Sequence, residues 1–315
     1  MPFSQSLKAR ILIILFVLPV FGFSQYYWDF GLNLGPSNYV GDIGGKEKTR
    51  RDYFVDMHLK TTRWVVGGYA RYKATPKWYL RSNLNWIRLT AFDSNSLNPA
   101  RVGRNLNFRN NVIEASVRGE YVFERTSDVG RTGRYRLAFD AYLFGGAGVF
   151  YHNPKAQYNG KWIALQPLMT EAQVKPYSRF QFTIPYGIGM HYTIDRKYRI
   201  GLELEYRTTF TDYLDDISTT FPQKGQLSDP TAIALSNRST PDVVNNIEPQ
   251  EGYPQPTLYT YSPGFKRGDP THNDAYLTVN VTVGMVIRGK SNFYRAKYSF
   301  GKGRKGVRRK SRAKF

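Results

Sequence analysis

Much of this chain alternates between apolar and polar residues with a period of two, and no other feature limits its fold as strongly. Successive side chains of a β-strand point to opposite faces, so each alternating segment predicts a strand with one apolar and one polar face. In the first segment, Tyr26, Trp28, Phe30, Leu32 and Leu34 alternate with Tyr27, Asp29, Gly31, Asn33 and Gly35. The complete set comprises residues 26–35, 64–72, 78–86, 113–123, 137–143, 180–192, 198–206 and 277–287.

The connections between these segments alternate in length. The long ones cover roughly residues 36–63, 92–110, 152–178 and 211–274, and the short ones cover 73–77, 124–135 and 195–197. Outer-membrane barrels have an even number of strands, short periplasmic turns and long extracellular loops. A soluble all-β domain is the alternative, but a β-sandwich does not require every second loop to be long. The sequence therefore predicts an all-β fold, an eight-stranded antiparallel transmembrane β-barrel of the outer-membrane type.

Composition agrees with a barrel. Aromatic residues make up 16% of the chain, yet its mean hydropathy is only −0.49, whereas a bundle of membrane helices would be far more apolar. A barrel has an apolar, aromatic-rich outer face, a polar interior and polar loops, so its average is hydrophilic. The chain has no cysteine, so we expect its stability to come from a core or from outer-membrane lipid rather than from disulfides.

The N-terminus predicts export. Lys8 and Arg10 precede an apolar run from Ile11 to Phe23, and small residues at Gly22 and Ser24 suit cleavage before Gln25. That is the pattern of a secretory signal peptide, and the run is too short for a membrane-spanning helix. We therefore divide the chain into a signal peptide at 1–24, a barrel with long extracellular loops at 25–288, and a basic periplasmic tail at 289–315. The expected location is the outer membrane.

Charged residues occur on the strand faces opposite the aromatic residues. An eight-stranded barrel has an interior only wide enough to be filled by side chains. We therefore expect these charges to pair into a plug rather than to line an open pore. The residues concerned are Arg71, Arg81, Glu114, Arg118, Glu120, Asp140, Glu203, Glu205 and Arg207.

Catalytic signals are weak, and we expect no catalytic residues and no enzyme activity. The histidines His58, His152, His191 and His272 show no metal-ligand spacing. His191 lies on the polar face of a predicted strand, where pairing with a serine or an acid would suit an outer-membrane hydrolase. We favour a histidine packed in the lumen.

Two further patterns predict structure rather than chemistry, and we expect neither a metal nor a cofactor. Asp212, Asp215 and Asp216 resemble a loose cation site but lack the spaced ligands of a calcium loop, so we expect solvated carboxylates. The glycine-rich run 144–148 lies within a predicted strand and begins no helix, so it indicates room in the barrel wall rather than a phosphate-binding loop.

The C-terminal tail concentrates positive charge. Residues 289–315 contain eleven Lys and Arg residues and no acid, within a chain of net charge +21. With an even strand number the tail emerges in the periplasm, where an acidic protein surface or an anionic envelope polymer is the expected partner and nucleic acid is not. The alternative is a merely solvated extension. The predicted partner-binding residues are Lys302, Arg304, Lys305, Arg308, Arg309, Lys310, Arg312 and Lys314.

The opening of the mature chain also resembles a known family. Residues Phe30 to Gly44, FGLNLGPSNYVGDIG, the eight-strand layout and the basic tail resemble the PorG-like outer-membrane barrels of the type IX secretion and gliding machinery of Bacteroidetes. In such proteins the barrel is thought to contact a periplasmic ring of a lipoprotein and its partner. The resemblance implies a non-enzymatic component that ties such ring proteins to the outer membrane. A small passive channel and, less favoured, an outer-membrane hydrolase are the alternative functions.

Overall fold

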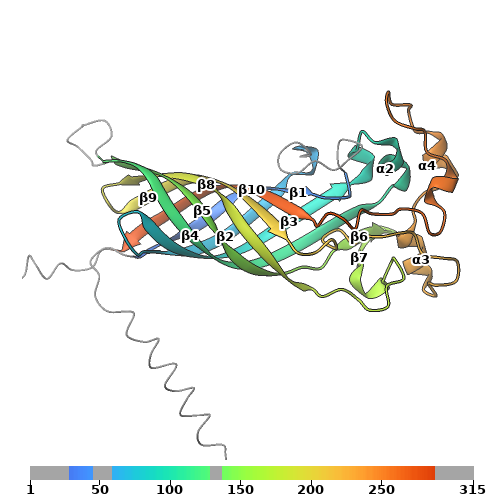
Figure 1. The fold of residues 1–315 in the computed structure, drawn as a ribbon, viewed down its shortest axis with the longest axis horizontal. Helices are drawn as coiled ribbons and strands as arrows, with labels where there is room; N and C mark the ends of the chain where they lie inside the picture. Colours follow the sequence, from blue (N-terminus) through green and yellow to red (C-terminus); the bar gives the residue numbers. More distant parts are fainter. Residues whose placement is uncertain (1–27, 45–58, 128–136, 288–315) are drawn as a thin grey trace, which may run out of the picture. The chain divides into compact units, whose positions relative to one another are not determined.

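Eight long antiparallel strands follow the eight alternating segments of the sequence (Figure 1). The computed structural model describes residues 28–44, 59–127 and 137–287. The predicted signal peptide at 1–24 and the predicted tail at 289–315 lie outside the described residues. The long strands are β1 (Trp28–Val40), β2 (Arg63–Lys73), β3 (Trp78–Phe92), β4 (Asn107–Thr126), β5 (Leu137–Tyr151), β8 (Phe180–Ile194), β9 (Tyr198–Thr209) and β10 (Ala275–Ile287).

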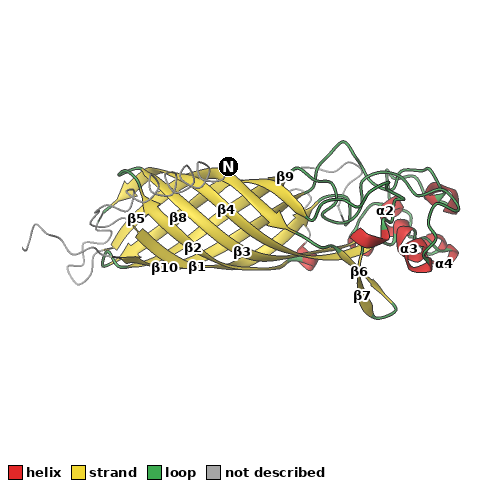
Figure 2. Ribbon diagram, turned by 90° about the horizontal axis from the view of Figure 1, so that it is seen from below, coloured by secondary structure: helices red, strands yellow, loops and turns green. Residues whose placement is uncertain are grey.

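These strands close into a barrel. Each pairs with its neighbour in the order β1, β2, β3, β4, β5, β8, β9 and β10, and β10 returns to β1 (Figure 2). Gly35 lies at this closing seam, where a Cβ would collide with the carbonyl oxygen of Val279. Closure leaves no long strand with an unpaired edge, as a sheet that crosses a membrane would require. The prediction of an eight-stranded antiparallel barrel is confirmed.

The two faces of the barrel also follow the predicted alternation. Along β1, Phe30, Leu32 and Leu34 are exposed, whereas Asp29 and Asn33 are buried. The glycine-rich run 144–148 lies within β5, as predicted, and a Cβ on Gly146 would collide with Val117 and Arg118 of β4. Glycine there lets β5 approach the backbone of β4 closely.

Several strands are longer than the sequence pattern predicts. β1 continues to Val40, so the connection predicted at 36–63 begins only at Gly41. The Ser37 hydroxyl donates to the carbonyl oxygen of Arg88, 2.6 Å away, and so extends the sheet contacts. Strand β4 begins at Asn107, which shortens the connection predicted at 92–110 to residues 93–106. These strands continue beyond the apolar band of the barrel. The strand ends there were not predicted, because apolar and polar residues no longer alternate regularly.

The long connections carry short elements that alternation did not predict. A hairpin, β6 (Lys155–Tyr158) and β7 (Lys161–Ala164), pairs with β4 near the start of that strand, at Arg109. Three short helices, α2 (Pro99–Arg104), α3 (Pro230–Ser236) and α4 (Pro241–Asn245), each begin with proline after an Asn, Asp or Thr cap. Single 3-10 turns are η2 (Leu59–Thr61), η3 (Asp93–Asn95), η4 (Gln166–Leu168) and η5 (Leu258–Tyr261). None of the helices in the described residues is long and apolar enough to span a membrane.

Candidate functional site

The barrel lumen is filled by a charge network. Glu203 of β9 is the acceptor for two guanidinium groups, Arg81 Nη1 at 2.5 Å and Arg118 Nη2 at 2.6 Å. Arg71 Nε lies 2.6 Å from Glu120 Oε2, and Arg207 Nε lies 2.6 Å from Glu114 Oε2. All nine charged residues expected to face the lumen are buried, which confirms the predicted plug. The residues are Arg71, Arg81, Glu114, Arg118, Glu120, Asp140, Glu203, Glu205 and Arg207.

Aromatic rings cover the guanidinium groups of this network. The Arg81 guanidinium carbon lies 3.7 Å from the ring centre of Tyr69, and that of Arg118 lies 3.9 Å from the ring centre of Phe144. The Tyr142 hydroxyl donates to Glu203 Oε1 at 2.5 Å. Burial of charges is costly unless they are paired and hydrogen-bonded. The lumen meets that requirement with four arginines and four glutamates in mutual contact, and it is therefore packed rather than open.

His191 belongs to this packed lumen. It is 1% exposed, its Nε2 lies 3.1 Å from Asp140 Oδ2, and its ring packs against Tyr142. Asp140 also accepts from Arg125 Nε at 2.6 Å. In the described part of the chain, no serine hydroxyl hydrogen-bonds to His191, so the arrangement lacks a nucleophile for the hydrolase alternative. The prediction of a packed lumen histidine is confirmed.

The long connections fold over one end of the barrel as a cap, which we define as residues 93–106, 152–179 and 210–274 together with 41–44. Figures 1 and 2 show its short helices beyond the strand ends. Leu214 and Ile217 of the longest connection are fully buried against Ile43, Phe108 and other apolar residues at the barrel end. The 210–274 connection therefore supplies the main cover of this end of the barrel.

Two buried arginines, each in an ion pair, join the connections of the cap. Arg104 of α2 donates to both carboxylate oxygens of Asp93, at 2.8 and 2.9 Å, and to the carbonyl oxygen of Asp42. Arg267 donates from Nη1 to Glu171 Oε1 at 2.9 Å, which joins the 210–274 connection to 152–179. The bidentate, buried pair of Arg104 with Asp93 fixes geometry as well as neutralising charge. The cap is therefore a connected structure rather than a set of independent loops.

The aspartates predicted to be solvated are instead buried. Asp215 and Asp216 are 1% and 0% exposed, and Asp212 is 8% exposed. Asp216 accepts from the Thr170 and Tyr177 hydroxyls. The solvated-loop prediction is therefore wrong, because the connection folds back onto the barrel end. Among the described residues no group of His, Asp and Glu could hold a metal ion.

Asp215 and Asp274 both contact the hydroxyl of Tyr39. The distances are 2.7 Å to Asp215 Oδ2 and 2.5 Å to Asp274 Oδ1, and the Asp42 backbone N–H also donates to this hydroxyl. A tyrosine hydroxyl has one proton, so it can donate to only one carboxylate. A neutral Asp215 donating its own proton would satisfy the second contact. Burial and, next, the charge of Asp42 raise the pKa of Asp215 to about 7, although Arg104 acts against this rise.

Because of this arrangement, the cap is expected to loosen as the pH rises. The pKa of Asp215 rises from 3.8 to about 7 on folding, so the folded cap holds a proton that the unfolded loop releases. The free energy of unfolding should therefore fall between these values, by up to about 1.4 kcal/mol per pH unit, and level off above them. Asp216, whose pKa burial raises to about 6, contributes with the same sign.

Limited proteolysis within residues 211–274 measures this effect. Cleavage of the parent should be faster at pH 8 than at pH 5, with the protease's own pH profile corrected on an unfolded substrate. Asp215→Asn removes the titrating group, so this variant should show a smaller difference between the two pH values. Equal pH dependence in parent and variant would contradict the role given to Asp215.

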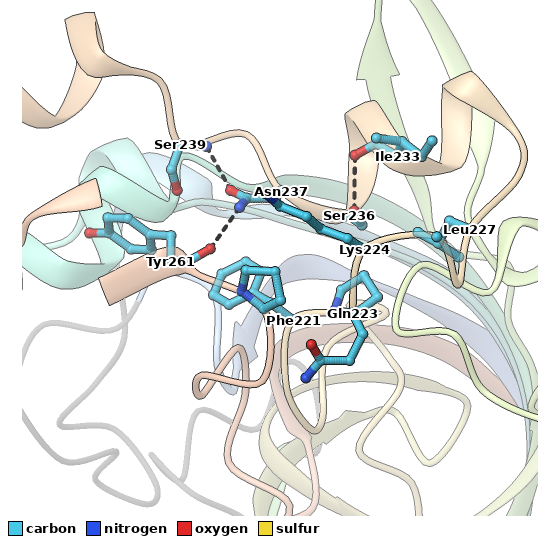
Figure 3. A pocket seen from close by; sticks show the side chains of 12 residues that line it. Phe221, Gln223, Lys224, Leu227, Ile233, Ser236, Asn237, Ser239 and Tyr261 are labelled. Atoms are coloured by element: carbon cyan, nitrogen blue, oxygen red, sulfur yellow. Dashed lines mark hydrogen bonds between the residues drawn. The ribbon is translucent and has the colours of Figure 1, made fainter. Parts of the chain in front are cut away.

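The cap also contains a hollow of about 370 Å³, formed wholly by residues 221–263 (Figure 3). Asn237 bridges it, because its Nδ2 donates to the Tyr261 carbonyl oxygen at 2.8 Å and its Oδ1 accepts from the Ser239 N–H. Phe221 and Tyr261 are buried, and Lys224 is the single charged residue among the twelve that line the hollow. This set has no acid or base pair for catalysis, so the hollow is suited to binding at most.

The predicted partner-binding residues cannot be placed beside these features. Lys302, Arg304, Lys305, Arg308, Arg309, Lys310, Arg312 and Lys314 all lie outside the described residues. Conversely, sequence reasoning missed the contact of Tyr39 with Asp215, which are 176 residues apart. The sequence hints at this contact only through the acidic run 212–216, which does not identify Tyr39 as the partner.

A family model described as a domain of unknown function (DUF6089) matches residues 8–229. The chain belongs to this family. The match includes strands β1 to β9 and stops immediately before α3, so the DUF6089 region leaves out most of the 210–274 connection and β10. A search of curated proteins found no match.

Solved outer-membrane barrels are similar at low identity. The attachment invasion locus protein Ail of Yersinia pestis, in complex with the heparin analogue sucrose octasulfate, is 10% identical, with 83% of this chain and 99% of that chain covered and a TM-score of 0.33. Another structure of Ail is 8% identical, with the same coverage and a TM-score of 0.32. CarO2 of Acinetobacter baumannii is 10% identical, with 82% and 99% covered and a TM-score of 0.24.

Proposed function

We propose that this protein is a non-enzymatic outer-membrane component that anchors a periplasmic assembly, within a secretion or gliding machinery of the type IX kind that the sequence resembles. The observation that carries the proposal is the filled lumen, in which Glu203 accepts from Arg81 and Arg118 and the rings of Tyr69 and Phe144 cover these arginines. A barrel packed in this way suits a rigid anchor. It offers no water-filled path of the kind that the channel alternative requires.

Two aromatic girdles support the outer-membrane location. At the short-turn end, Trp28 contacts Tyr72 and Trp78 contacts Tyr121, with ring centres 5.1 and 5.0 Å apart. Toward the cap, Trp64 contacts Trp86, and Tyr151 contacts Phe180. Between the girdles the outer face is apolar. Transmembrane barrels have this arrangement, an apolar band with aromatic rings at both interfaces.

The tail is the proposed contact with periplasmic ring proteins. β10 ends at Ile287, at the end of the barrel where the short connections lie, and the eleven positive charges follow in the sequence. Each exposed ion pair contributes only about 0–1 kcal/mol, but many together give a useful attraction. An acidic periplasmic surface is the partner that this charge favours, and nucleic acid is not expected in the periplasm.

Neutralising the tail tests this function. A variant with glutamine at Lys302, Arg304, Lys305, Arg308, Arg309, Lys310, Arg312 and Lys314 should insert normally but lose at least tenfold in co-purification with its periplasmic partners. Secretion or gliding should fall with it, and single substitutions should have little effect. The matched control neutralises Lys155, Lys161 and Lys224 in the cap. Co-purification and secretion equal to those of the parent, at low and high salt alike, would exclude the tail as the contact.

The proposed orientation makes a separate prediction. A protease added to whole cells should cut within residues 211–274, where Lys224 is exposed, and should spare residues 289–315. Epitope tags at each position followed by immunoblotting report the two cleavages, and lysed cells provide the control in which both sites are cut. Cleavage of the tail in intact cells would place the C-terminus outside and overturn the orientation.

A further inference from the structure

A second hollow lies in the cap beside the one in Figure 3, and Tyr261 lines both. It has a volume of about 370 Å³ and is bordered by α2, by Thr260 and Tyr261, by residues 266–269 and by Asp42. The Tyr261 hydroxyl donates to the Ala100 carbonyl oxygen at 2.8 Å, which fixes this wall against α2. Residues from three separate connections therefore build the second hollow.

Four cations line this hollow, and two of them are already engaged by the protein. Arg104 is held by Asp93 and by the carbonyl oxygens of Asp42 and Arg267. Arg267 is held by Glu171 and by the carbonyl oxygens of Ser236 and Asp216. These two arginines form the frame of the hollow and have little capacity left for a ligand.

Arg101 and Lys266 are the remaining two cations. The Nη1 atom of Arg101 is buried, and the described residues supply no hydrogen-bond acceptor for it. Lys266 is largely exposed and makes one loose pair with Asp269, at 3.4 Å. The carboxylates of the hollow are themselves occupied, since Asp42 Oδ2 accepts from the Asp269 N–H and Asp269 accepts from the Thr271 hydroxyl. Arg101 Nη1 and the exposed ammonium of Lys266 are therefore the cationic donors of this hollow that a negative ligand could use.

We propose that this hollow binds a small oxyanion, a solute with a phosphate, sulfate or carboxylate group that accepts from Arg101 and pairs with Lys266. Buried donors in native proteins almost always have a partner, so a buried guanidinium nitrogen without one points to a ligand or water where, as for Arg101 and not for Arg238, the residue also lines a hollow. The planar guanidinium suits a phosphate, sulfate or carboxylate, which can accept two parallel hydrogen bonds. The hollow lies beyond the strand ends with α2, away from the apolar band that faces lipid, so the source is a free solute rather than a lipid headgroup.

Calorimetric titration of the full chain in detergent micelles tests the site, with inorganic phosphate, sulfate and acetate as separate probes. We expect saturable binding of at least one of the three that weakens with added sodium chloride. Arg101→Gln should weaken it at least tenfold, and Lys266→Gln, at an exposed position that folding does not need, should weaken it severalfold. Arg238→Gln is the matched control, because Arg238 lies in the cap outside this hollow and donates to the Gln157 carbonyl oxygen. It should change binding less than twofold.

Two results would overturn the proposal. One is the absence of saturable binding for all three oxyanions. The other is binding that Lys266→Gln and Arg101→Gln leave unchanged, with both variants shown to be folded by circular dichroism. Anionic lipid vesicles form a separate arm, because binding to vesicles alone is the first of these two results and assigns the site to a lipid headgroup. The site depends on the cap alone, so failure of the tail experiment would leave it untouched.

Discussion

Glu203→Ala is expected to destabilise the folded barrel by about 3–5 kcal/mol, because removing one partner of a buried ion pair leaves uncompensated charge. Glu203 is 1% exposed and accepts from Arg81, Arg118 and the Tyr142 hydroxyl. Without it, two buried guanidinium groups lose their closest carboxylate. Urea unfolding of the refolded protein in lipid vesicles, followed by tryptophan fluorescence, measures the change.

The control and a compensating variant make this test specific. Glu124→Ala removes an exposed carboxylate near the end of β4 and should change stability by less than about 0.5 kcal/mol. Glu203→Leu combined with Arg118→Leu removes both partners, so it should be more stable than Glu203→Ala. If Glu203→Ala unfolds at the same urea concentration as the parent, the lumen charges are hydrated and the plug does not exist.

Val281→Arg is expected to cost about 2–4 kcal/mol and to impair barrel assembly, because arginine at mid-membrane on the lipid face is strongly unfavourable. Val281 lies in the middle of β10, pairs with Leu202 and is 46% exposed on the outer face. Its neighbour Thr282 is 2% exposed and faces the lumen, so Thr282→Ser should assemble like the parent. Heat-modifiable migration in gels reports the folded fraction in isolated outer membranes. Normal assembly of Val281→Arg with failure of Thr282→Ser would mean that Val281 faces the lumen and Thr282 faces lipid.

The strands, and the side of each strand that faces outward, could be predicted because the alternation of apolar and polar residues is a local signal. In β8, Phe182, Ile184, Ile188 and Met190 recur at even spacing and are all exposed on the outer face. One strand is enough to reveal the pattern, and a shift of one residue would place every apolar side chain in the lumen. The prediction that charged side chains pair inside the lumen rests on the same alternation, together with the fact that a barrel of this size has space only for side chains.

The cap could not be predicted, because its contacts join residues far apart in the sequence without any period. Asn110 illustrates this, since its amide donates to the Leu214 carbonyl oxygen 104 residues away, at 2.8 Å. Asp215 was misjudged for the same reason, because a loop carboxylate carries no sequence sign of burial. The hairpin of β6 and β7 is too short for its alternation to stand out.

Crosslinking from the tail in intact cells tests the central claim, that the barrel holds a periplasmic assembly through residues 289–315. A photo-crosslinking amino acid at Lys305 or Arg309 should capture one or a few periplasmic proteins, identified by mass spectrometry. The same group at Lys224 in the cap, the matched position outside the barrel, should not capture them. Tail positions that yield no product above the Lys224 control, in a strain that secretes normally, would contradict the proposed anchoring function.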